Sequence, residues 1–165
     1  MAEHARRSTQ DDCPLLHSFM AMDMDERWVN RSPQTMLETF HYFRGECFRF
    51  IVDDLLRLPR EPGVIVEGFR LLPRLVKPLL SITSRAVWLL PTPDFRQAAI
   101  DSKAWGFLAK TTDPARALRN LLERDRMFTD ILREETARLG LQAIEVDSRM
   151  TEDDLVMRVM EVLQL

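Results

Sequence analysis

The chain of 165 residues has little glycine, little cysteine and no long apolar run. With only five Gly, the glycine-rich loops that bind phosphate are scarce. Two cysteines, Cys13 and Cys47, exclude a scaffold of many disulfides, and we expect two reduced thiols in a cytoplasmic protein. No run approaches the ~18 apolar residues of a membrane span, and no apolar stretch behind Met1 is typical of a secretion signal.

The charge balance excludes a further class of partner. Lys and Arg number 23 against 26 Asp and Glu, and of those 23 basic residues only three are Lys. The net charge is −3, and no basic stripe with interleaved aromatic residues occurs, so we expect no nucleic-acid partner. Hydrophobic residues at 45% and charged residues at 30% indicate one globular domain over residues 1–165. We expect no membrane partner.

Hydrophobic periodicity and cap signals predict an alternation of helices and short strands after an irregular segment of about residues 1–31. Expected helices cover about 32–58, 71–80, a segment from 94, 114–139 and 152–163. Expected strands cover 64–66, 86–90 and 143–146, and residues 101–112 are expected to form a mobile loop or short helix. This order predicts an α/β fold, a layered parallel sheet with flanking helices.

The expected strand at 64–66 ends on an acidic residue. In an open parallel sheet, ligands bind beyond the carboxyl ends of the strands. Glu67 there suits a Mg²⁺ ion or a substrate hydroxyl, and Gly68 lets the backbone approach a ligand closely. The alternative interpretation is that Glu67 pairs with Arg70 or accepts hydrogen bonds from backbone amides.

An arginine-rich stretch of the expected helix 114–139 is the second candidate. Guanidinium groups bind phosphate oxygens bidentately and stabilise charge in phosphoryl transfer, which makes Arg119, Arg124 and Arg126 candidates for phosphate binding. The alternative is an exposed helix face, because Arg119 with Glu123 and Arg126 with Asp130 have the i,i+4 spacing of surface ion pairs.

No complete catalytic motif is present. Gly63 and Gly68 have the spacing of a phosphate loop, but Phe69 and Arg70 follow where Lys and Ser or Thr are required. The His and Cys residues lack zinc-site spacing, and no Gly-x-Ser-x-Gly occurs, so neither a zinc site nor acyl transfer is indicated.

Five short motifs nevertheless share an order with a known family. They are VIVEG at 64–68, LLP at 71–73, AVWL at 86–89, LERD at 122–125 and IEVD at 144–147. Together they resemble the later part of the P-loop small-molecule kinases, a group that includes shikimate, gluconate and adenylate kinases. The resemblance runs from about residue 32 to residue 165.

The resemblance implies a phosphotransferase that acts on a small molecule with ATP and Mg²⁺. Glu67 and Arg124 would be its catalytic residues, Glu67 at the metal or acceptor and Arg124 against phosphate charge. Gly68, Arg119 and Arg126 would contact the cofactor, and residues 101–119 would match a mobile lid.

The family's phosphate loop, the Walker A segment, has no counterpart in the sequence. In that fold the strand before the loop lies between the counterparts of 64–66 and 86–90, so we expect an incomplete core. Three explanations stay open: a misplaced start codon, a truncated and inactive remnant, or coverage of the sheet edge by the N-terminal segment, a partner chain or a homo-oligomer.

A second function stays open beside the ATP-dependent kinase. The chain could be a non-catalytic interaction or regulatory protein that uses the α/β shell. It would bind its partner through an exposed sheet edge or through the methionine-rich run at 20–24.

Overall fold

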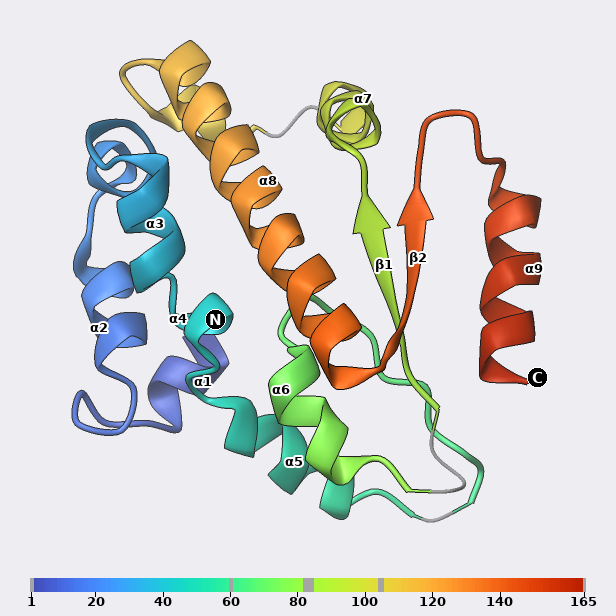
Figure 1. Cartoon of the computed structure of the whole chain (residues 1–165). Coiled ribbons are helices and arrows are strands. Elements are labelled where there is room, and N and C mark those ends of the chain that lie inside the picture. The colour runs from blue at the N-terminus through green and yellow to red at the C-terminus, as the bar shows by residue number, and fades with distance from the viewer. Residues whose placement is uncertain (1, 60, 82–84, 104–105, 165) are drawn as a thin grey trace.

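A computed structural model describes residues 2–59, 61–81, 85–103 and 106–164. The long helix α8 (Pro114–Leu139) runs through the middle of the molecule, between a group of short N-terminal helices and a two-stranded sheet (Figure 1). Beyond the sheet lies α9 (Glu152–Leu163). Because α8 contacts both strands and several N-terminal helices, it joins the two halves of the chain.

The N-terminal half is built from short helices. Residues 32–58, predicted as one helix, form three pieces. The extended backbone of Phe40 divides the first two, and Gly45 and Cys47, left-handed with φ of 84° and 63°, divide the second from the third. The helices of this half are α1 (Ala2–Arg6), α2 (Pro14–Ala21), the π-helix η1 (Glu26–Asn30), α3 (Pro33–Thr39), α4 (His41–Arg44), α5 (Phe48–Leu56), α6 (Pro73–Val76) and the 3₁₀ turn η2 (Lys77–Leu79).

The C-terminal half follows the sequence pattern closely. Strands β1 (Val87–Pro91) and β2 (Gln142–Val146) pair in parallel, with Val87 opposite Gln142 and Pro91 opposite Val146. Helix α7 (Pro93–Lys103) and the 3₁₀ turn η3 (Leu108–Lys110) precede α8. Two of the three predicted strands and the helices 114–139 and 152–163 are therefore confirmed. Residues 104 and 105, within the predicted mobile loop or short helix at 101–112, lie outside the described residues.

Aromatic packing dominates the core on the N-terminal side of α8. Phe43 of α4 stacks on Phe128 of α8 with ring centroids 3.6 Å apart. Burial of one such side chain contributes about 2 kcal/mol, so this cluster is a main source of stability. Its buried members are Phe19, Leu37, Phe40, Tyr42, Phe43, Leu72 and Phe128.

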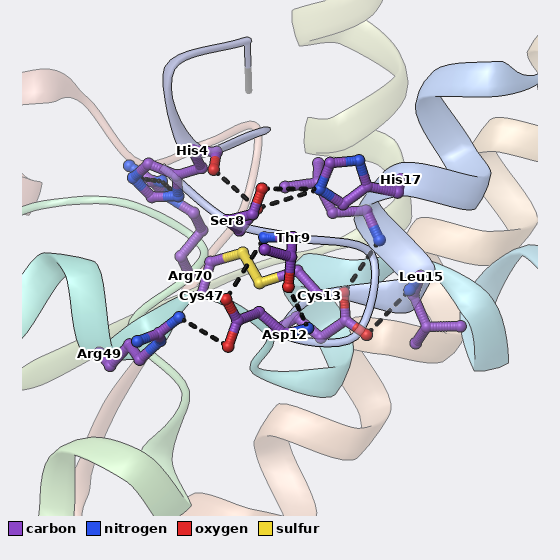
Figure 2. The surroundings of a disulfide bond; sticks show 12 residues. His4, Ser8, Thr9, Asp12, Cys13, Leu15, His17, Cys47, Arg49 and Arg70 are labelled. Atoms are coloured by element: carbon purple, nitrogen blue, oxygen red, sulfur yellow. Dashed lines mark hydrogen bonds and ion pairs between the residues drawn. A yellow bond between two sulfur atoms is a disulfide. The ribbon is translucent and has the colours of Figure 1, made fainter. Parts of the chain in front are cut away.

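A disulfide between Cys13 and Cys47 joins the start of α2 to the start of α5, with Cα atoms 6.5 Å apart (Figure 2). The sequence predicts two separate thiols here, and the structure pairs them. The neighbouring Glu46 caps α2, because its carboxylate accepts hydrogen bonds from the amides of Leu15 and Leu16, both at 2.9 Å. This corner of the molecule is thus fixed both covalently and by a cap.

The predicted fold class is wrong. Residues 64–66 form no strand, and the sheet of the described residues has two strands rather than a layered arrangement with helices on both sides. Val64, Ile65 and Val66 are 52%, 85% and 39% exposed. The preference of valine and isoleucine for strands depends on cross-strand neighbours, and here no neighbouring strand supplies them. Helical packing around α8 takes the place of the expected sheet core.

Among the described residues, none of the helices has the length and apolar character needed to cross a membrane.

Candidate functional site

The cleft between α7 and α8 opens at the carboxyl end of β1. Its volume is about 410 Å³. Both helices begin at capped residues: Thr92 accepts a hydrogen bond from the amide of Phe95 at 3.3 Å, and Asp113 accepts one from that of Arg116 at 2.9 Å. The charged side chains that line the cleft are Asp94, Arg96, Arg119, Glu123, Asp125, Arg126, Asp130 and Arg133.

Asp125 is the most enclosed of the cleft carboxylates that form ion pairs, with 12% of its side chain exposed. Its Oδ1 accepts hydrogen bonds from Nε and Nη2 of Arg124 at 3.0 and 2.6 Å. Its Oδ2 accepts from Nε of Arg96 at 3.0 Å and from Nη2 of the same guanidinium. One carboxylate therefore fixes two guanidinium groups, one on each helix.

Arg124 does not face a ligand. It is 6% exposed, and its guanidinium lies 5.0–5.2 Å from the ring centres of Trp28, Phe40 and Phe43. A guanidinium over aromatic faces gains cation–π stabilisation that grows as water is excluded. Arg124 is thus a buried link between the aromatic core and Asp125, and the predicted phosphate contact would require it to leave this position.

Arg126 lies on the exposed side of α8 in a row of ion pairs. It donates to Glu123 at 3.0 and 2.8 Å and to Asp130 at 2.7 Å. The guanidinium of Arg126 lowers the pKa of Glu123 by hydrogen bonding, and the pKa of Arg126 is raised for the same reason. The contact between Arg126 and Asp130 is the surface ion pair that the sequence offered as the alternative to phosphate binding. Arg133 extends the row through Asp130 at 2.6 Å.

Arg119 is a cleft arginine that stays unpaired in the described part of the chain. Its predicted partner Glu123 pairs with Arg126 instead, three residues away. Within the described ranges, Arg119 makes no hydrogen bond or ion pair, and its side chain is exposed at the cleft wall. An unengaged guanidinium there can bind an anion without first breaking an internal salt bridge.

Glu67 and Gly68 lie outside the cleft. Both are exposed and belong to the irregular segment that follows Gly63, so Glu67 does not end a strand as predicted. Gly68 adopts φ of +140°, a conformation that favours glycine, and no atom lies within 4 Å of the position a Cβ would take. The structure therefore brings Arg119 and Arg126 together, and it separates Glu67 from them.

No described group of three or more His, Cys, Asp or Glu side chains converges on a metal position. Glu67 makes no hydrogen bond or ion pair to another described residue, so it could offer one carboxylate to Mg²⁺. Mg²⁺ commonly takes one or two carboxylates together with phosphate oxygens and waters. Glu67 could therefore supply one carboxylate ligand to Mg²⁺. It offers no second protein ligand.

Sequence reasoning missed two features around the site. One is Arg96, in the first turn of α7, which lines the cleft and binds Asp125. The only sequence signal for it was its position shortly after the helix cap at Thr92. His41 in α4 is fully buried, and neither ring nitrogen has a partner among the described residues. Burial lowers the pKa of His41 to about 4, with repulsion from His4 and Arg70 in the same direction.

Comparison with known proteins adds no relative: no family model, no curated protein and no solved structure matches this chain.

Proposed function

We propose that the chain is a kinase-like phosphotransferase domain that binds a phosphorylated small molecule in the α7–α8 cleft. The observation that carries the proposal is the guanidinium of Arg119, unpaired among the described residues, at the wall of a cleft that Arg96 also lines. The cleft opens at the carboxyl end of a parallel strand, where α/β units bind ligands. The motif order of the sequence supports the same reaction class.

Each arginine at the cleft would have a different role in binding the anion, set by its contacts. Arg119 would bind phosphate oxygens as a planar fork, and Arg96, held by Asp125, would add positive charge to the lining of the same cleft. Arg126 would contribute positive potential at the rim rather than a direct contact, since two carboxylates engage it. Arg124 would position Asp125 from the buried side.

ATP with Mg²⁺, when bound, would supply the phosphoryl group. Glu67 could offer one carboxylate to the metal only at its own position outside the cleft, and Gly68 leaves the backbone there open to a ligand. The sequence holds no phosphate loop. Residues other than those of such a loop would therefore have to bind the phosphates of the nucleotide.

Binding measurements test the proposal directly. Isothermal titration of the purified chain with inorganic phosphate, a sugar phosphate and Mg²⁺–ATP should show saturable binding of at least one of them. Arg119→Ala should weaken it about tenfold or more, since a phosphate contact by guanidinium is charge-assisted. Arg138→Ala is the matched control, an exposed arginine of α8 that does not line the cleft. No binding at millimolar concentration, or an equal effect of both variants, would contradict the proposal.

A second candidate is the non-catalytic interaction protein. Val156, Met157 and Met160 of α9 are 49%, 67% and 41% exposed, which leaves an apolar surface on the outermost helix. Such surfaces mark sites where proteins associate. Light scattering of the purified chain tests this candidate, and a monomer at every concentration that binds no partner would count against it.

A further inference from the structure

The chain contains an unpaired strand edge. β1 pairs with β2 on one side, and on its other side it has no strand partner among the described residues. It carries no charged side chain, and Leu89 in its middle is 45% exposed. An uncharged edge with an exposed leucine is a template for another strand, since its outer N–H and C=O groups make no backbone hydrogen bond to another described residue. β2 is protected differently, because Gln142 and Glu145 are polar and exposed.

The chain also contains an unused strand-forming segment. Residues 64–66, Val-Ile-Val, are all β-branched, and Ile65 is 85% exposed. No backbone hydrogen bond joins residues 64–67 to another described residue. Gly63 and Gly68 border the run, so it can straighten with little steric resistance. Residues 63–67, the run with one neighbour on each side, match the five residues of β1 in length.

The run does not occupy the edge of its own chain. Trp88 of β1 donates from Nε1 to the carbonyl of Leu71 at 2.8 Å, and Leu72 is fully buried. These contacts fix the chain just after the run beside β1, yet the run itself stays exposed. Each molecule thus presents one apolar strand donor and one apolar strand acceptor that do not meet.

We infer that two copies of the chain pair reciprocally, the run 64–66 of each copy adding as a strand to the free edge of β1 of the other. This inference rests on the second function proposed above and names its partner, and it does not involve the α7–α8 cleft. A reciprocal exchange uses both edges and both runs, so the assembly closes at two copies. Backbone hydrogen bonds supply the affinity, and burial of Ile65 and Leu89 adds to it.

Mass measurement by light scattering during gel filtration tests the inference. The native chain should move from monomer to dimer as its concentration rises. Ile65→Asp places a charge in the added strand and should raise the dimer dissociation constant at least about tenfold. Leu79→Asp is the matched control, since Leu79 is 54% exposed but lies in η2 outside the run, and it should dimerise like the native chain.

Cysteine crosslinking locates the contact. Single variants Ile65→Cys and Leu89→Cys, mixed under mild oxidation, should give a covalent heterodimer, whereas mixed Leu79→Cys and Leu89→Cys should not. Hydrogen exchange should show slower exchange of the outer β1 amides as dimer forms.

Each other result overturns the inference. A monomer at all concentrations does so, and so does a monomer with protected β1 amides, which would mean that the run pairs within its own chain. A growing series of oligomers excludes the closed exchange. Association that survives Ile65→Asp but is lost in Met157→Glu overturns the edge pairing and leaves the interaction function standing through α9. Phosphate binding by Ile65→Asp reports separately on the cleft.

Discussion

Arg124 donates two hydrogen bonds to the carboxylate of its own neighbour in the chain, Asp125, at 3.0 and 2.6 Å. Arg124 lies in the core and Asp125 lines the cleft, so this short contact connects the aromatic core of the N-terminal half to the candidate site. A change in packing around Arg124 would therefore alter the position of Asp125, and through it that of Arg96.

The first prediction concerns this pair. Asp125→Asn should destabilise the protein by about 3 kcal/mol or more, because removing one partner leaves a buried charge without compensation. Urea unfolding followed by circular dichroism measures the change. Glu123→Gln on the same helix is the control, and it should have little effect, since its ion pair with Arg126 is half exposed. Equal destabilisation by the two variants would show that Arg124 does not depend on Asp125.

The second prediction concerns pH. The pKa of His41 is lowered from 6.5 to about 4 in the folded protein, so the unfolded chain binds the proton more readily between these values. The free energy of unfolding should therefore be fully maintained above about pH 6.5 and fall as the pH drops toward 4, by about 3 kcal/mol over the window.

Urea midpoints measured from pH 7.5 to pH 4 give this slope, and His41→Phe should flatten it. A residual slope is expected from His4, whose pKa is also lowered, mainly by burial. A native chain whose stability does not change between pH 6.5 and pH 4.5 would refute the role of His41.

Local signals predicted the C-terminal half of the fold well. Asp113 before Pro114 and Gly140 after Leu139 set the bounds of α8, because caps and left-handed glycines act within a few residues of sequence. The same holds for Thr151 and Asp154, which form a capping box at the start of α9.

The strand at 64–66 could not be decided from sequence. A short run of β-branched residues becomes a strand only when a neighbouring strand lies beside it, and that depends on the whole chain. The break at Gly45 and Cys47 was missed for a related reason: the apolar period continues across it, while the left-handed backbone of these two residues ends α4 and precedes α5.

The candidate site was partly predictable. The placement of Arg119 and Arg126 on one exposed helix face followed from their spacing. The burial of Arg124 did not, because the rings of Trp28, Phe40 and Phe43 come from two segments that are far from Arg124 in the sequence. Arginine patterns on a helix therefore indicate a face, and tertiary packing decides which guanidinium stays available.

The third prediction isolates the packing around Gly45. This glycine adopts φ of +84°, and a Cβ there would lie 2.7 Å from Cδ1 of Leu75. Gly45→Ala should combine the left-handed penalty of about 1–2 kcal/mol with a displacement of Leu75. Gly140→Ala is the matched control, because Gly140 also has a left-handed φ and has no neighbour within 4 Å. Equal losses of stability in the two variants would mean that Leu75 adjusts at no cost.

The last prediction concerns the Cys13–Cys47 disulfide, which closes a loop with a sequence separation of 34 residues. In the chain-entropy description, closing a loop of that length stabilises the folded state by about 4 kcal/mol, because the crosslink restricts the unfolded chain. Dithiothreitol should therefore lower the urea midpoint of the native chain. The double variant Cys13→Ala/Cys47→Ala should unfold at a lower midpoint and respond to no reductant, which separates the crosslink from general effects of the reagent. A native midpoint that is unchanged by reductant, with two free thiols found beforehand, would show that the thiols stay reduced and that the N-terminal corner depends on packing and on the Glu46 cap.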